Sequence, residues 1–281
     1  MARLVATDRG IGRLEHDDSI SLLDVPGSSL EETFRAGTTP ESLQYAVVRE
    51  RLDRGELILG PPVRRPGKIW AVGFAYAEHS AEVGRQESDE EPFVFLKASS
   101  SIIGPGQAIR LPRLAPERVD YEGEVAVVIG RGGYWIGEGA AWDHVLGYTA
   151  ANDVSARDIQ REGPFNGGKS DPTKGKSFDS FTPIGPCVCT LDEYRDPADV
   201  GLRTVVDDDE RQRTRTSSLV FTVPRIISFV SRFARLEPGD VILTGTPAGV
   251  GHPAGRFLRQ GSVVQVEVEG AGVLANPVEA E

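Results

Sequence analysis

The stretch VDYEGEVAVVIG, residues 119–130, joins three carboxylates at alternate positions to an apolar run. The apolar part, residues 125–129, has the composition of a buried β-strand. Successive side chains of a strand point to opposite faces, so Glu122 and Glu124 share one face, and Asp120 would join them. The stretch therefore predicts a buried strand that directs two or three negative charges to one place.

A further carboxylate, Asp153, follows a second predicted strand in AANDVSARDIQ, residues 150–160. Three carboxylates from two strands would form an oxygen-only ligand set, which suits Mg²⁺, Mn²⁺ or Ca²⁺, whereas Zn²⁺ favours His or Cys. The alternative is a solvated strand end whose glutamates face water. Spacing alone favours that alternative.

The composition excludes several classes of protein. The 281 residues carry a net charge of −11 without a basic cluster, which argues against a nucleic-acid partner. No apolar run is long enough for a signal region or a membrane span, so we expect a cytoplasmic protein without a membrane partner. Cys187 and Cys189 are the only cysteines, and we expect them to be free thiols side by side on a strand.

The chain is expected to be mostly β with a few helices, since 32 Gly and 19 Pro indicate many turns. A Pro-rich boundary at residues 60–68 divides it into a small N-terminal α+β module, residues 1–64, and a larger domain, residues 65–281. Helices are predicted over residues 39–55, with Thr39 as cap, and over residues 223–236, where the apolar positions include Phe233.

Four motifs occur in a fixed order: DYEGE (120–124), NDVSARDIQ (152–160), GKSFDSFTPIGP (175–186) and LEPGDVILTGTPAGVG (236–251). Together they resemble the fumarylacetoacetate hydrolase family, from about Lys68 to the C-terminus. The resemblance implies a mixed β-sandwich roll around a divalent metal, usually as a homodimer. It also implies action on 2-oxo acids and related enols by C–C hydrolysis, decarboxylation, isomerisation or hydration.

The resemblance implies a metal site. Glu122, Glu124 and Asp153 match the family's metal ligands, whereas Asp120 matches a position that is not normally a ligand. Mg²⁺ is the expected ion, with Mn²⁺ or Ca²⁺ as alternatives. Lys176 in GKSFD matches the family's site lysine, whose charge would stabilise an enolate; the alternative is a solvated surface lysine.

His79 and Glu82 lie three residues apart in GFAYAEHSAEVG, so on a helix they would share a face. A carboxylate beside an imidazole orients it and raises its basicity, an arrangement suited to activating water. The segment resembles the family's pattern for its hydrolytic pair, although Ala75 stands where Asn is often found. The alternative is an ordinary surface pair.

Four residues are candidates for binding the substrate. Arg157 and Gln160 match family site positions, with a structural ion pair to Asp158 or a neighbour as the alternative for Arg157. Thr246 lies in a Gly-rich turn that relatives place near the substrate carboxylate. Lys97, which ends the predicted strand PFVFLK, is a weaker candidate, because a charge at a strand end is more often solvated.

Three further segments are harder to interpret. Residues 161–176 depart from the family pattern and are expected to border the pocket and affect substrate choice. His252 follows the Gly-rich turn and could lie near the site, but nothing in the sequence fixes its position. Asp207 and Asp208 are expected to form a hairpin turn.

The leading hypothesis is a metal-dependent hydrolase that cleaves an acylpyruvate-like 2,4-dioxo acid to pyruvate and a carboxylic acid. The first alternative is a decarboxylase of an oxaloacetate-like acid, or an isomerase or hydratase of 2-oxo or 2-hydroxydienoic dioic acids, at the same site. The second is a catalytically silent module that binds a metal or ligand.

Overall fold

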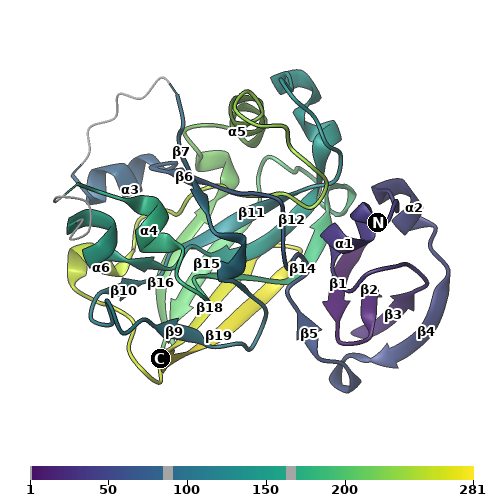
Figure 1. Cartoon of the computed structure of the whole chain (residues 1–281), viewed down its shortest axis with the longest axis horizontal. Helices are drawn as coiled ribbons and strands as arrows, with labels where there is room; N and C mark the ends of the chain where they lie inside the picture. Colours follow the sequence, from purple (N-terminus) through teal and green to yellow (C-terminus); the bar gives the residue numbers. More distant parts are fainter. Residues whose placement is uncertain (1, 85–90, 163–168) are drawn as a thin grey trace.

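The computed structural model describes residues 2–84, 91–162 and 169–281, apart from the side chain of residue 162. The fold is mostly β, as the sequence predicts. Strands β1–β4 lie at one end of the molecule, and helices α3, α4 and α6 lie at the other (Figure 1).

The largest sheet runs through the whole molecule. Its strand order is β4 (Val48–Asp53), β3 (Ser19–Leu23), β2 (Gly10–Leu14), β1 (Arg3–Thr7), β14 (Thr182–Thr190), β12 (Val145–Asn152), β11 (Gly123–Ile129), β17 (Val241–Leu243), β6 (Ile69–Gly73) and β7 (Phe93–Lys97), with β5 (Leu59–Gly60) beside β1 and β8 (Ile102–Ile103) beside β14. The N-terminal strands extend this sheet, because β1 pairs with β14. The proposed division between residues 64 and 65 stays a prediction.

A second sheet packs against β11, β12 and β14. Its order is β16 (Asp209–Arg215), β15 (Gly201–Val206), β18 (Val263–Val268), β19 (Gly272–Ala280) and β9 (Ile109–Leu111), and a separate pair consists of β10 (Val119–Asp120) and β13 (Ser155–Ala156). Asp207 and Asp208 both have positive φ in the two-residue turn between β15 and β16, which confirms the predicted hairpin.

Strand β11 is buried on both faces, as its apolar run predicts. Val125 and Val127 pack into one apolar cluster, while Ala126 and Val128 pack into the other. The strand lies between β12 and β17, so its backbone is fixed on both sides. The carboxylates at its start are therefore held by a rigid element.

The helices are short. They are α1 (Leu30–Arg35), α2 (Pro40–Gln44), α3 (Ala77–Glu82), α4 (Pro172–Lys176), α5 (Val223–Val230) and α6 (Gly251–Ala254), with 3₁₀ turns η1 (Arg54–Glu56), η2 (Ser99–Ser101), η3 (Glu138–His144), η5 (Leu191–Glu193) and η6 (Thr216–Ser218) and a π-helical turn η4 (Asp158–Glu162). None of the helices within the described ranges has the length and apolar character needed to cross a bilayer. The cytoplasmic location stays a prediction.

Two predicted helices are too long. Thr39 does cap α2, but the helix ends at Gln44, and β4 follows where helix was expected up to residue 55. Pairing of β4 with β3 outweighs the local helical preference. Helix α5 ends at Val230, so Phe233 lies outside the helix and is 62% exposed rather than part of the core.

The two cysteines are free thiols, as expected, and both are buried in β14. Cys187 donates to the carbonyl of Ala271 over 3.1 Å. Burial raises the pKa of Cys187 to about 12, which keeps this thiol protonated and unreactive at neutral pH.

Candidate active site

Three buried carboxylates converge at the start of β11. Glu122 lies just before the strand, Glu124 lies within it, and Asp153 follows the end of β12. Each offers an oxygen within 4.8 Å of the others. The alternation of the sequence therefore brings together the three residues that were expected to form one ligand set.

Asp120 lies outside this cluster, in agreement with its exclusion from the ligand set. Its carboxylate accepts the backbone N–H groups of Gly251 at 2.7 Å and His252 at 3.0 Å, and pairs with Arg157 at 2.7 Å. Asp120 therefore anchors the first turn of α6 beside the site.

Two buried lysines balance part of the negative charge. The ammonium of Lys176 lies 2.6 Å from Glu122 and 2.6 Å from Asp153. Lys97 hydrogen-bonds Asp153 on its other oxygen and donates to the carbonyl of Phe181 at 2.9 Å. The alternative of a solvated charge is wrong for both lysines, because their side chains are 3% and 0% exposed.

Glu124, unlike Glu122 and Asp153, is not balanced by a paired lysine or arginine among the described residues. It accepts the N–H of Gly245 at 2.6 Å. Burial raises its pKa well above the ordinary value, and the nearby charges of Asp153 and Glu122 raise it further. A divalent cation would relieve this repulsion, so the donor set and its charge fit Mg²⁺, Mn²⁺ or Ca²⁺.

His79 and Glu82 lie on the helix α3, where their spacing of three residues puts them on one face, and His79 lines a pocket that opens onto the carboxylates. The Nδ1 of His79 is 3.4 Å from Glu82, a long contact, which leaves Nε2 for another partner. Glu82 also accepts the N–H of Gly249 at 3.0 Å. Although burial opposes ionisation, the bonds from His79 and Gly249 lower the pKa of Glu82 and keep it charged.

Arg157 is buried between the two carboxylate groups. It pairs with Asp120 and, through Nη1, with Glu122 at 2.7 Å, and the same nitrogen donates to the Gln160 side chain at 2.8 Å. Although burial opposes its charge, Asp120 and Glu122 raise the pKa of Arg157. The structural ion pair that was weighed for Arg157 thus exists, with Asp120 and Glu122 rather than Asp158.

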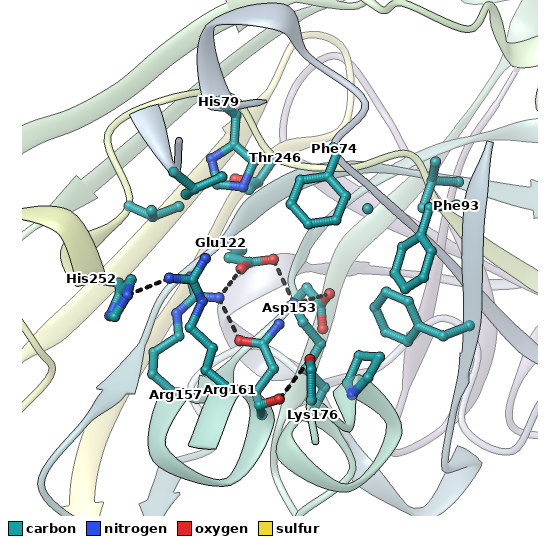
Figure 2. Close-up of a pocket in the computed structure, with 18 residues that line it drawn as sticks. Phe74, His79, Phe93, Glu122, Asp153, Arg157, Arg161, Lys176, Thr246 and His252 are labelled. Atoms are coloured by element: carbon teal, nitrogen blue, oxygen red, sulfur yellow. Dashed lines mark hydrogen bonds and ion pairs between the residues drawn. The ribbon is translucent and has the colours of Figure 1, made fainter. Parts of the chain in front are cut away.

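The pocket has walls of different character (Figure 2). Phe74, Phe93 and Phe95 form an aromatic side, and Lys176 lies 5.5 Å from the centre of the Phe95 ring. Arg161 and His252 lie on another side, with Glu122 and Asp153 between the two sides. The pocket therefore offers both apolar and cationic surfaces around the carboxylate cluster.

Thr246 lines the pocket, as expected, but its hydroxyl already has two partners. It donates to the carbonyl of Gly123 at 3.0 Å and accepts from Gln212 at 2.7 Å. Within residues 161–176, Arg161, Ser170 and Pro172 also line the pocket, whereas residues 163–168 lie outside the described part.

The sequence patterns gave Lys97 too little weight, and they assigned no individual role to Arg161, within the segment expected to border the pocket, or to His252. A signal existed for Lys97, because period two places it on the same face of β7 as Phe93 and Phe95, which line the pocket. Arg161 and His252 belong to different elements, the π-helical turn η4 and the helix α6, and they meet only through the fold.

The comparison with known families agrees with this geometry. The family model described as fumarylacetoacetate (FAA) hydrolase C-terminal matches residues 68–279. The chain belongs to the fumarylacetoacetate hydrolase family. The matched span includes all three clustered carboxylates, both lysines and the His79–Glu82 pair.

Similar members of the family differ in their named reactions. The chain is 43% identical, over 81% of its length and 70% of the relative, to the oxaloacetate tautomerase fahd2 of Xenopus laevis. It resembles the solved 5-carboxymethyl-2-hydroxymuconate delta-isomerase of Mycobacterium smegmatis at 34% identity, with a TM-score of 0.79 over 100% of this chain and 99% of that one. It also resembles the maleylpyruvate hydrolase of Sphingobium sp. SYK-6, solved with manganese(II) and pyruvate, at 28% identity and a TM-score of 0.76 over 99% of each chain.

Proposed function

We propose that this chain is a divalent-metal-dependent enzyme that forms the enolate of a 2-oxo acid, and that it acts as a tautomerase or isomerase. The observation that carries the proposal is the buried set Glu122, Glu124 and Asp153, which fits a cation, beside a His–Glu pair suited to proton transfer. The printed names of the similar tautomerase and isomerase support this order of preference.

The chemistry divides between the ion and the side chains. A divalent cation held by Glu122, Glu124 and Asp153 would supply Lewis acidity at the oxygens of the 2-oxo acid. Lys176 would offset negative charge that develops on an enolate oxygen, because its buried ammonium lies beside the same carboxylates. Although burial opposes that charge, Asp153 and Glu122 raise the pKa of Lys176 and keep it positive.

Proton transfer is assigned to His79. Glu82 holds its Nδ1, so Nε2 would take a proton from the carbon next to the oxo group and return it to the enolate. Arg157 is a positioning residue, since its guanidinium is already engaged by Asp120, Glu122 and Gln160. Tautomerisation needs only this proton relay and enolate stabilisation.

Hydrolysis of a C–C bond in an acylpyruvate is the second candidate, and it led in the reasoning from sequence. The His79–Glu82 pair favours it, because such a pair can also activate water. The named hydrolase among the similar structures supports it further. Decarboxylation of an oxaloacetate-like acid would use the same enolate stabilisation without attacking water.

The test follows two reactions with the purified, Mg²⁺-loaded protein. Loss of the enol absorbance of oxaloacetate measures tautomerisation, and pyruvate release from acetylpyruvate measures hydrolysis. Controls contain Mg²⁺ without protein, and protein with EDTA. EDTA-sensitive loss of enol above the Mg²⁺ control supports the proposal.

Other outcomes separate the remaining functions. Release of pyruvate from acetylpyruvate without faster loss of the enol would favour the hydrolase. Release of pyruvate from oxaloacetate would favour the decarboxylase. Turnover of neither substrate, with intact metal binding, would contradict the proposal and favour the silent module.

A further inference from the structure

Two buried side chains hold the backbone between the carboxylates Glu122 and Glu124. The N–H of Gly123 donates to Oε1 of Gln212 at 2.9 Å, and the carbonyl of Gly123 accepts the hydroxyl of Thr246 at 3.0 Å. The pairing of β17 with β11 stops short of Gly123, so these two side chains stand where a neighbouring strand would otherwise pair. We call Gln212 and Thr246 the Gly123 clamp.

The side-chain amide of Gln212 fixes the direction of every hydrogen bond in the clamp. Its Oε1 accepts the Gly123 N–H, so its Nε2 donates to the Thr246 hydroxyl at 2.7 Å and to the Pro247 carbonyl at 3.0 Å. The Thr246 hydroxyl accepts that bond and gives its single proton to the Gly123 carbonyl. The three residues form a closed ring, and Thr246 has no proton left to donate to a substrate carboxylate.

The second sheet approaches the start of β11 very closely at this point. Gln212 lies on β16, and Thr204 lies on the neighbouring strand β15. A Cβ atom at Gly123 would lie 1.9 Å from the hydroxyl oxygen of Thr204. Glycine is therefore required between the two glutamates, because it lets the second sheet reach their backbone.

The turn that carries Thr246 also holds two carboxylates of the site. The N–H of Gly245 donates to Glu124 at 2.6 Å, and the N–H of Gly249 donates to Glu82 at 3.0 Å. The Gly123 clamp ties this turn to the start of β11. A displacement of the turn would consequently move both a proposed metal ligand and the partner of the proton-transfer histidine.

We propose that Gln212 and Thr246 are positioning residues, which set the geometry of Glu122 and Glu124 for a cation through the backbone of Gly123. The inference rests on the proposed function, which places a divalent cation at these carboxylates. Partners that orient metal ligands typically contribute about 10- to 100-fold to metal affinity. Thr246 is thereby assigned to the geometry of the metal site rather than to a substrate carboxylate.

Titration with Mn²⁺, followed by EPR, tests the proposal on variants of the clamp. Gln212→Met removes the bonds of the amide, and Thr246→Val removes the hydroxyl while keeping the shape of the side chain. Each should weaken Mn²⁺ binding about tenfold. The double variant should lose little more than either single variant, rather than about 100-fold, because both side chains belong to one ring. Thr246→Ser keeps the hydroxyl and should retain most of the affinity.

A second measurement separates positioning from substrate binding. At saturating Mn²⁺, Thr246→Val should bind pyruvate no more weakly than Gln212→Met does, because both act through the same backbone. A direct role of Thr246 with substrate would instead weaken pyruvate binding in Thr246→Val alone.

The control separates positioning from an ordinary loss of stability. Tyr148 is buried outside the pocket lining, and its hydroxyl donates to the Pro197 carbonyl at 2.8 Å. Tyr148→Phe removes this bond, so it should lower the melting temperature and leave both the Mn²⁺ affinity and the EPR spectrum of bound Mn²⁺ unchanged. The clamp variants should change that spectrum as well as the affinity.

The outcomes distinguish the clamp from the function on which it rests. Wild-type Mn²⁺ affinity in folded Gln212→Met and Thr246→Val would overturn the proposal and leave the proposed function standing. If Gln212→Met does not fold, the comparison of Thr246→Val with Thr246→Ser decides, and equal Mn²⁺ affinity of these two variants overturns the proposal. A wild type that binds no Mn²⁺ would overturn the proposed function together with the clamp.

Discussion

Lys176 and Glu122 form a buried ion pair of 2.6 Å at the edge of the carboxylate cluster. The pair means that the fold supplies part of the counter-charge for its own acidic site. Glu124 does not share in it, and its raised pKa reflects burial together with the charges of Asp153 and Glu122. A buried carboxylate in this position destabilises the metal-free fold, and a bound cation would recover that free energy.

The first prediction concerns metal binding and stability. Mg²⁺ at about 100 times its dissociation constant should stabilise the wild type by about 2.7 kcal/mol. Glu124→Gln keeps an oxygen for the Gly245 N–H but removes the negative charge. Its metal-free form should melt above the wild type by a few degrees, since about 1 kcal/mol shifts Tm by roughly 2–4 °C.

Thermal melts with and without Mg²⁺ measure both effects. Glu279→Gln is the control, because Glu279 forms an exposed ion pair with Arg110. A Mg²⁺ shift in Glu124→Gln as large as that of the wild type would contradict the assignment of Glu124 as a ligand.

The second prediction concerns the proton relay. Glu82→Gln should lower kcat by about 10²-fold with little change in KM, because His79 loses the charged partner that holds and activates it. The Gln carbonyl oxygen can still accept the Gly249 N–H, so the fold around the turn should persist. Glu78→Gln, on the exposed side of the same helix, should retain wild-type kinetics. An unchanged kcat in Glu82→Gln would remove the pair from the mechanism.

The third prediction concerns Arg157 as a positioning residue. Arg157→Lys cannot reproduce the fork that joins Asp120, Glu122 and Gln160, so we expect a loss of roughly 2 kcal/mol in stability, together with weaker metal binding. Arg225→Lys, in an exposed pair with Glu138, should change stability by less than about 0.5 kcal/mol. Chemical denaturation and metal titration measure these effects, and a fully stable Arg157→Lys would refute the positioning role.

Sequence patterns predicted the parts of the site that follow local rules. Period two in the strand brought Glu122 and Glu124 to one face, and helical spacing paired His79 with Glu82. The positions of β11 and Asp153 also followed, because apolar runs define buried strands. These relationships depend on backbone geometry within a few residues.

The rest could not be predicted, because it depends on contacts between distant segments. The strand β4 replaces a predicted helix only because β3 is available for pairing. Arg161 meets His252 across 91 positions of sequence, and no local period connects them. The burial of Lys97 likewise depends on Asp153, which lies 56 positions further along the chain.

The last prediction concerns the protonation of His252. Burial and the charges of Arg161, Arg157 and Arg118 hold its pKa below the ordinary value of about 6.5. The folded protein therefore binds this proton less readily than the unfolded chain does. As pH falls through about 6.5, the unfolded chain takes up the proton first, so the contribution of His252 to stability decreases toward lower pH.

NMR titration of the histidine ring protons, assigned with His252→Gln, measures this pKa directly. Arg161→Gln removes the positive charge nearest to the imidazole and should raise the pKa of His252 toward 6.5. Arg225→Gln removes a distant positive charge and should leave the pKa of His252 unchanged. This control shows whether the pKa responds to the charge of Arg161 in particular. A His252 pKa that does not move in Arg161→Gln would mean that the two side chains are not in contact in solution.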